Sequence, residues 1–412
     1  MNPFEQKPVD IENTIQNWEE LYPKSYDKDE VSPYTKTRII LMNGTEYEQT
    51  FFYHQFSRHC NNNDLRREIA LIRRIEQQQQ KKIANTKPIN EPILETTISY
   101  EQLAVDLTAR LALSEPDQNV KGALDFALLE DFDHLYRYAD LLEMEHHVHA
   151  EKLVGKYTEI MPGRPTIAHH RHPYDTIRKF VDYKNAELIT KLHIGIITAA
   201  EQQTMNYYMN VGSFYTSDLG RKLYQEIGLV EEEHVTHYGS LMDPNATWLE
   251  GALMHEYTEC YLYYSCFQDE TEANIKKIWE QLFEQEIVHL HKVADLLKTY
   301  ENKEWQQVIP DGKFPELLTL GPNIDYVRNI LKNTVNQTDN KEEYIEVSQL
   351  PKNADFFKYQ QIINSDISQV PSHIVIDEYI NEKSKDYRFE TEENPIPELR
   401  DRTVDNTSVG RE

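Results

Sequence analysis

The sequence predicts an all-α protein, and three observations carry this prediction. Glycine is scarce (13 of 412 residues) and proline is modest at 18, so strong turn formers are few. Few segments show the alternation of apolar and polar residues that marks a half-buried strand. Apolar residues recur instead at helical spacing over long stretches, as with Leu65, Ile69, Ile72 and Ile75.

The helical pattern divides into segments separated by proline-rich breaks at 87–92 and 161–173. We expect helices over about 45–58, 64–84, 99–113, 120–152, 175–211, 217–241, 248–267 and 271–300. The pair Asn43-Gly44 could close a β-hairpin, but we favour a helix that begins at about Thr45.

Composition excludes several classes of function. A net charge of -27 argues against nucleic-acid binding, which needs a basic surface. No apolar run is long enough for a membrane span, and the N-terminus lacks the pattern of a signal peptide. Three cysteines, Cys60, Cys260 and Cys266, cannot form a disulfide framework or a four-thiolate site. We therefore expect a cytoplasmic protein that binds neither membranes nor nucleic acid.

The pattern also predicts a division of the chain. We expect an N-terminal arm at 1–40, an N-terminal helical region at 41–160 and a four-helix bundle at 175–300. Residues 301–412 are polar and acidic, which predicts an extended, partly disordered tail whose last twenty residues lack independent structure.

One arrangement of residues occurs twice: a glutamate is followed thirty residues later by a Glu-x-x-His motif. The residues are Glu201 with Glu231 and His234, and Glu256 with Glu286 and His289. A tyrosine follows the first glutamate of each set by seven residues, at Tyr208 and Tyr263.

This spacing has a chemical reason. Residues three apart on a helix share a face, so each Glu-x-x-His motif presents a carboxylate and an imidazole to one point. Two such motifs with two further glutamates form the ligand set of di-iron and di-manganese carboxylate bundles. Alternatively, the motifs belong to tandem helical hairpins whose glutamates lie at the surface. We favour metal binding, because one motif is common by chance and the repeated set is not.

The N-terminal half contains a partial echo of this arrangement. Glu101 precedes Glu130, and His134 lies one turn after Glu130. These residues could bind metal as a diverged third copy, or could form a buried Glu–His hydrogen bond in a scaffold hairpin. The histidine-rich segments 143–152 and 169–172 are expected to be solvated.

Residues 185–300 resemble the ferritin-like superfamily, and most closely the di-iron domain of rubrerythrins. EQQTMNYY, which contains Glu201, is similar to that family's first ligand helix, and EEEH to its second. The resemblance implies that Glu201 is a terminal ligand and that Tyr208 lies beside the metals. It also implies that Glu231 bridges the metals, that His234 binds one, and that Glu286 and His289 match the fourth helix.

The third helix of rubrerythrins carries two glutamates three apart, one of which moves on and off the metal. Glu256 and Glu259 have this spacing, which implies that Glu256 is a terminal ligand and Glu259 the mobile one. We further expect Glu286 to bridge, His289 to end the ligand set, and Tyr208 and Tyr263 to donate hydrogen bonds to the ligands. The chain lacks the two Cys-x-x-Cys pairs of the rubredoxin-like iron site in rubrerythrins, so its electron donor stays unknown.

These features predict a protein with two iron ions, or manganese in their place, that acts as an oxidoreductase on hydrogen peroxide or oxygen. Within the fold, a rubrerythrin-like peroxidase and a manganese catalase-like activity are both open, as is iron handling. A structural or cargo-type protein, in which the metal stabilises the fold, is the alternative from another class. We expect a homo-oligomer.

Overall fold

The computed structural model describes residues 1–388 and confirms the all-α class, because most of these residues are helical. Strand is limited, within the described residues, to an antiparallel pair formed by β1 (Gln337–Asn340) and β2 (Glu343–Glu346). A search of the same residues found no helix with the length and apolar character needed to cross a membrane.

The chain forms two compact units, and each is assembled from separate stretches of sequence. The first unit comprises 1–91, 180–203 and 242–319. The second unit comprises 92–179, 204–241 and 320–412, of which 389–412 lie outside the described residues. The helix α7 (Leu188–Phe214) begins in the first unit and ends in the second.

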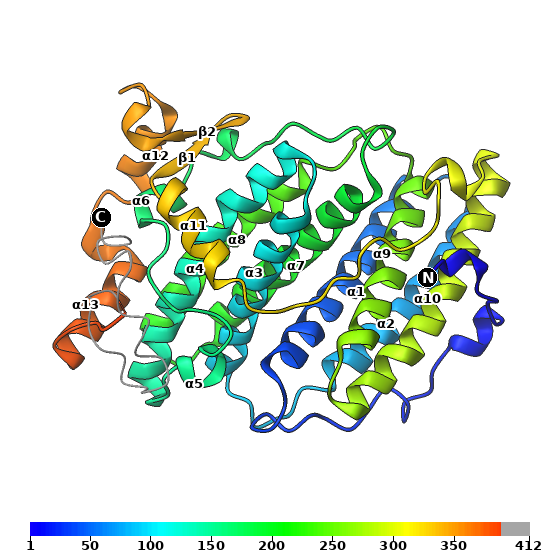
Figure 1. The fold of residues 1–412 in the computed structure, drawn as a ribbon, viewed down its shortest axis with the longest axis horizontal. Helices are drawn as coiled ribbons and strands as arrows, with labels where there is room; N and C mark the ends of the chain where they lie inside the picture. Colours follow the sequence, from blue (N-terminus) through cyan, green and yellow to red (C-terminus); the bar gives the residue numbers. More distant parts are fainter. Residues whose placement is uncertain (389–412) are drawn as a thin grey trace. The chain divides into compact units, whose positions relative to one another are not determined.

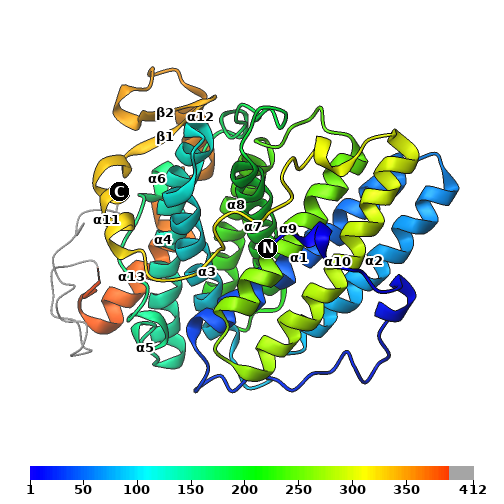
Figure 2. The same ribbon diagram turned by 45° about the vertical axis from the view of Figure 1, so that its right-hand side comes forward.

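Four long helices pack side by side in the first unit (Figures 1 and 2). They are α1 (Pro33–His59), α2 (Asn63–Ala84), α9 (Trp248–Asp269) and α10 (Ala273–Glu301). Helices α1 and α2 pack against each other as one hairpin, and α9 and α10 pack against each other as a second hairpin. The two hairpins contact each other where α1 meets α9 and where α2 meets α10. The apolar stripe predicted for 64–84 is buried here on α2.

Helix α1 starts about three turns earlier than Thr45, so the predicted start was wrong. Its true start has two local signals: Pro33 occupies the first helical position, and the Ser32 side chain accepts a hydrogen bond from the Tyr34 N–H. Gly44 lies inside this helix and makes no turn. A Cβ at Gly44 would come within 2.7 Å of Cβ of Gln203 on α7, so the glycine permits a close helix crossing.

The N-terminal arm holds two short 3₁₀ turns, η1 (Pro3–Glu5) and η2 (Ile11–Thr14), before α1. It packs on the first unit through Phe4, whose ring stacks on Trp305 with centroids 3.8 Å apart. Trp305 belongs to η4 (Trp305–Gln307), which follows α10.

The second unit is built around α3, α4 and α8, together with the C-terminal part of α7. The long helices are α3 (Ile93–Ser114), α4 (Gln118–His146) and α8 (Asp218–Gly239). Helix α4 packs against both α3 and α8. The connection from α4 to α7 carries the short elements α5 (Glu151–Val154), α6 (Thr166–His169) and η3 (Pro173–Asp175).

The C-terminal region differs from the extended tail that its composition predicts. Between 320 and 388 it forms α11 (Ile324–Thr334), the β1–β2 hairpin, η5 (Val347–Gln349), α12 (Asp355–Ile363), η6 (Ile367–Gln369) and α13 (Pro371–Lys383). Helix α13 packs on α4 and α8, and Arg388 forms buried ion pairs with Asp140 and Glu151. Burial against existing helices explains this order, and composition alone cannot show it. The predicted unstructured end lies outside the described residues.

The two units also differ from the predicted partition. Residues 175–300 were expected to form one bundle, but α8 lies in the second unit while α9 and α10 lie in the first with α1 and α2. The expected region at 41–160 is divided in the same way, because α3 and α4 belong to the second unit. Helical periodicity identifies each hairpin but does not specify which hairpins pack together.

Gly163 tests the packing of the second unit. A Cβ there would lie 2.4 Å from the Leu129 carbonyl oxygen and 2.8 Å from the Asp133 backbone nitrogen. We expect Gly163→Ala to lower the free energy of unfolding by about 1–3 kcal/mol, because the clash is with backbone that cannot move freely. Denaturant unfolding measures this change. Gly321→Ala is the control, since nothing lies within 4 Å of its Cβ position, and an equal loss in both variants would contradict the account.

Candidate metal centres

All four long helices of the first unit bring acidic side chains into the core. The residues are Glu46 on α1, Glu76 on α2, Glu256 and Glu259 on α9, and Glu286 with His289 on α10. These six residues, which we call the first-unit cluster, are all fully buried.

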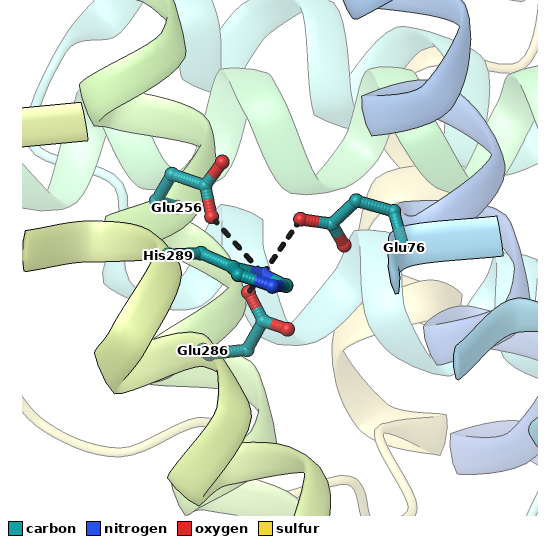
Figure 3. A group of neighbouring side chains, drawn as sticks. All are labelled: Glu76, Glu256, Glu286 and His289. Carbon is teal, nitrogen blue, oxygen red and sulfur yellow. Dashed lines mark hydrogen bonds and ion pairs between the residues drawn. The ribbon is translucent and has the colours of Figure 1, made fainter. Parts of the chain in front are cut away.

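The imidazole of His289 lies at the centre of three of these carboxylates (Figure 3). Its Nδ1 is 2.8 Å from Glu76 Oε1, 3.4 Å from Glu286 Oε2 and 3.8 Å from Glu256 Oε2. One ligand atom from each of these four residues lies within 4.8 Å of all the others, so the group could hold a metal ion.

A second group lies beside this one and contains only carboxylates. One oxygen from each of Glu46, Glu76 and Glu259 lies within 4.8 Å of the others. Glu76 belongs to both groups, so the first-unit cluster offers two neighbouring metal positions with one carboxylate in common.

Two tyrosines support the cluster reciprocally across α1 and α9. Tyr53 on α1 donates a hydrogen bond to Glu256 on α9, and Tyr263 on α9 donates one to Glu46 on α1. Both tyrosines are fully buried. They follow Glu46 and Glu256 by seven residues, so the sequence interval that predicted Tyr263 also applies to Tyr53.

The electrostatics of the first-unit cluster favour a cation. Burial, and then repulsion between neighbouring carboxylates, holds the pKa of Glu46 and of Glu259 well above the usual range. The charges that raise the Glu259 pKa are those of Glu76, Glu286, Glu46 and Glu256. Both carboxylate oxygens of Glu259 are buried without a hydrogen-bond partner among the described residues.

The neighbouring carboxylates also raise the pKa of His289. Burial alone would lower its pKa, but the carboxylates of Glu76 and Glu286 raise that pKa well above the ordinary value of 6.5. In the absence of metal, these shifts favour proton binding to Glu46, Glu259 and His289. A metal ion must displace those protons.

The second unit contains a separate group of carboxylates and imidazoles. Its members are Glu101 on α3, Asp131 and His134 on α4, and Glu231 and His234 on α8, and all are buried. We call these five residues the second-unit cluster. Glu231 connects its two histidines: Oε1 is 3.0 Å from His134 Nδ1, and Oε2 is 3.2 Å from His234 Nδ1.

Three members, Glu101, His134 and Glu231, present ligand atoms within 4.8 Å of one another and could hold a metal ion. His234 Nδ1 also lies 3.2 Å from Asp131 Oδ1. The Tyr208 hydroxyl donates to Glu101 Oε1, as Tyr263 does to Glu46 in the first unit. Burial holds the pKa of His134 well below its ordinary value, so this imidazole is neutral and ready to bind a metal.

Glu130 has a different partner from the one that its spacing predicted. Its Oε1 accepts a 2.5 Å hydrogen bond from Arg171, and its Oε2 lies 2.8 Å from His234 Nε2. Burial alone would raise the Glu130 pKa, but Arg171 and His234 hold it well below the usual range. Glu130 therefore orients His234 from the side away from the other carboxylates, as the outer partner of a metal-binding histidine does.

Glu201 is buried on α7, three residues before Thr204, where the part of this helix that belongs to the second unit begins. It precedes Tyr208 by seven residues, so the two side chains share a face of the helix. Glu201 is not grouped with Glu256, Glu286 or His289, but its carboxylate does belong to one of the buried groups of side chains that could hold a metal ion. Its role as a ligand stays a prediction.

The structure therefore divides the predicted ligand set between two clusters. It brings Glu256, Glu259, Glu286 and His289 together, and places Glu231 and His234 in the other unit. Sequence reasoning missed Glu46, Glu76 and Asp131.

The thirty-residue interval could have predicted these three residues. Glu46 precedes Glu76 by thirty residues, and Glu101 precedes Asp131 by the same interval. Two substitutions obscured the pattern. Gln79 stands where the motif has histidine, and Asp131 stands where it has glutamate.

The histidine-rich segment at 169–172 was expected to be solvated, and this was wrong for two residues. His169 and His170 are buried, and His170 Nε2 lies 3.1 Å from Glu226 Oε1. Arg171, which lies between His170 and His172, is also fully buried and pairs with Glu130.

The raised pKa values predict how stability depends on pH in the metal-free chain. Groups with raised pKa values bind protons on folding, so the free energy of unfolding falls as pH rises above the ordinary values of 4.5 for Glu259 and 6.5 for His289. We expect chelator-treated protein to be less stable at about pH 8 than at about pH 6, measured by denaturant unfolding.

Glu259→Gln should reduce this slope, because an amide cannot lose a proton. Glu284→Gln is the matched control on an exposed position of α10. A slope that Glu259→Gln leaves as steep as in the parent would show that the first-unit cluster does not set the pH dependence.

Comparison of the chain with protein-family models, with curated proteins and with solved structures found no match. The geometry of the two clusters is therefore the basis for a functional assignment.

Proposed function

We propose that this chain is a ferritin-like, non-haem di-metal carboxylate protein that acts as an oxidoreductase on hydrogen peroxide or oxygen. The observation that supports it best is the first-unit cluster, in which five carboxylates and one imidazole are buried together. Buried carboxylates at this density are costly unless protons or cations neutralise them. A pair of divalent cations would neutralise them within one ligand cage.

The arrangement of helices supports the ferritin-like part of the proposal. The chain contains four pairs of consecutive long helices in which a glutamate on the first helix is followed, thirty residues later, by an acidic residue on the second. The first unit combines the hairpin α1–α2 with the hairpin α9–α10. Glutamates directed inward from all four helices are the hallmark of di-iron and di-manganese bundles.

Iron or manganese fits these ligands, because both accept carboxylate oxygen and imidazole nitrogen. Glu76 is the shared residue of the first-unit cluster and is the natural bridge there, in place of the predicted Glu286. Glu231 keeps its predicted bridging role, since it faces both histidines of the second-unit cluster. When bound, the metals supply the change of oxidation state that peroxide or oxygen reduction needs.

The side chains around the ligands have their own tasks. Tyr53 and Tyr263 donate hydrogen bonds that fix the orientation of Glu256 and Glu46. Tyr208 does the same for Glu101. The fully buried surroundings exclude bulk water, so these donors and the carboxylates interact in a medium of low dielectric constant.

Metal content and peroxide consumption test this proposal together. We expect elemental analysis to give about four iron or manganese ions per chain, two for each cluster. Glu76→Ala and Glu231→Ala should each remove about half of this metal, because each removes the bridge of one cluster. Protein loaded with ferrous iron should consume one hydrogen peroxide for each pair of Fe²⁺ ions, which supply the two electrons that reduce it to water, and manganese-loaded protein should convert two peroxides to oxygen and water. A peroxide assay and an oxygen electrode measure these reactions. Metal-loaded protein that leaves peroxide and oxygen unchanged would contradict the catalytic assignment and favour a metal that only stabilises the fold.

The roles of Asp131 and Glu130 can be separated by paired substitutions. Asp131→Asn should lower the metal content of the second unit with little loss of stability. Glu130→Gln should lower the free energy of unfolding by about 2 kcal/mol, because it removes one of the three carboxylates that pair with the buried Arg171, the others being Glu233 and Asp339. Elemental analysis and denaturant unfolding of both variants measure these effects. The reverse pattern would make Glu130 the ligand.

A further inference from the structure

The two metal positions of the first-unit cluster differ in their ligands. One position has His289 with Glu76, Glu256 and Glu286, and the other has only Glu46, Glu76 and Glu259. The second position therefore offers oxygen ligands alone.

Gln79 accounts for the absence of an imidazole from the α1–α2 hairpin. It stands three residues after Glu76, where the other three hairpins carry His134, His234 and His289. Its side chain is fully buried, and its Nε2 donates a 2.5 Å hydrogen bond to Glu286 Oε1. The amide nitrogen is thus occupied and cannot bind metal, while Oε1 is buried without a hydrogen-bond partner among the described residues.

Glu259 supplies a carboxylate on the same side of the cluster. It extends from α9, three residues after Glu256, and the corresponding place on α3, three residues after Glu101, is Ala104. Both oxygens of Glu259 are fully buried and have no hydrogen-bond partner among the described residues. The first-unit cluster thus has an additional carboxylate on α9 and no histidine on α2.

The second-unit cluster does not share this asymmetry. Its group of Glu101, His134 and Glu231 contains an imidazole, and His234 faces Glu231 from α8. Each histidine there lies about 3 Å from an oxygen of the same glutamate.

We propose that the position formed by Glu46, Glu76 and Glu259 is a site for a hard, oxygen-preferring divalent cation, with Mn²⁺ as its representative. The inference rests on the proposed di-metal function and assigns different metals to different positions. Carboxylate and carbonyl oxygens suit Mg²⁺, Ca²⁺ and Mn²⁺, whereas imidazole suits zinc and iron. The first-unit cluster would then hold a mixed pair, with the imidazole-preferring metal at His289.

Reciprocal substitutions test this site without a measurement of activity. Metal-free chain is equilibrated with Mn²⁺ in large excess over Zn²⁺, because zinc binds a given site more tightly than manganese does, and is then desalted and analysed for both elements. We expect the parent to retain about one Mn²⁺ per chain, with zinc at the positions that contain imidazole. Gln79→His should shift the zinc-to-manganese preference of that position by at least about tenfold, since even indirect partners change metal affinity by that much.

His134→Gln is the reciprocal change in the second unit, and should raise the retained Mn²⁺ above the parent value. Glu259→Gln removes one carboxylate from the proposed site, and should lower the retained Mn²⁺ while zinc is unchanged. Circular dichroism establishes that each variant is folded, and Glu259→Gln keeps the test decisive if Gln79→His does not fold.

Two outcomes distinguish the manganese site from the proposed oxidoreductase activity. Zinc at every position of the parent, or a ratio that neither Gln79→His nor Glu259→Gln changes, would overturn the manganese site and leave peroxide chemistry standing. Retained Mn²⁺ that responds to these substitutions, in protein inert toward peroxide, would support the site and contradict the oxidoreductase.

Discussion

The cost of burying carboxylates without counter-charges is the constraint on which the rest of this structure depends. In the first unit, Glu46, Glu76, Glu256, Glu259 and Glu286 share one core, and burial opposes their ionised forms. Apolar packing of four helices must supply the stability that this cluster removes. Protons or cations must balance this charge, and the ligand atoms of the cluster could hold a metal ion.

The two units meet this constraint in different ways. In the second unit, Arg171 neutralises Glu130, and His134 and His234 stand between the remaining acids. In the first unit, the carboxylates of Glu76 and Glu286 raise the pKa of His289 and so favour its protonated form. Metal binding to the first-unit cluster should therefore release more protons than metal binding to the second-unit cluster. The metal affinity of the first-unit cluster should then depend more steeply on pH.

Much of the site could be read from the sequence, because a helix fixes which residues share a face. The thirty-residue interval identified Glu256, Glu286 and His289, and the same rule would have found Glu46 and Glu76. What the interval cannot show is which hairpins share a core. That pairing depends on complementary packing between α1 and α9, which are distant in sequence. Order in the C-terminal region likewise depends on long-range contacts, such as the ion pairs of Arg388.

The central claim is that this chain holds metal at two separate buried clusters, and anomalous X-ray scattering from crystals of metal-loaded protein tests it most directly. Data collected at the iron and manganese absorption edges should show density between Glu76 and His289, and separate density beside Glu231. Density at only one cluster would contradict the second site. Density at neither, in protein shown to be folded, would contradict the account as a whole.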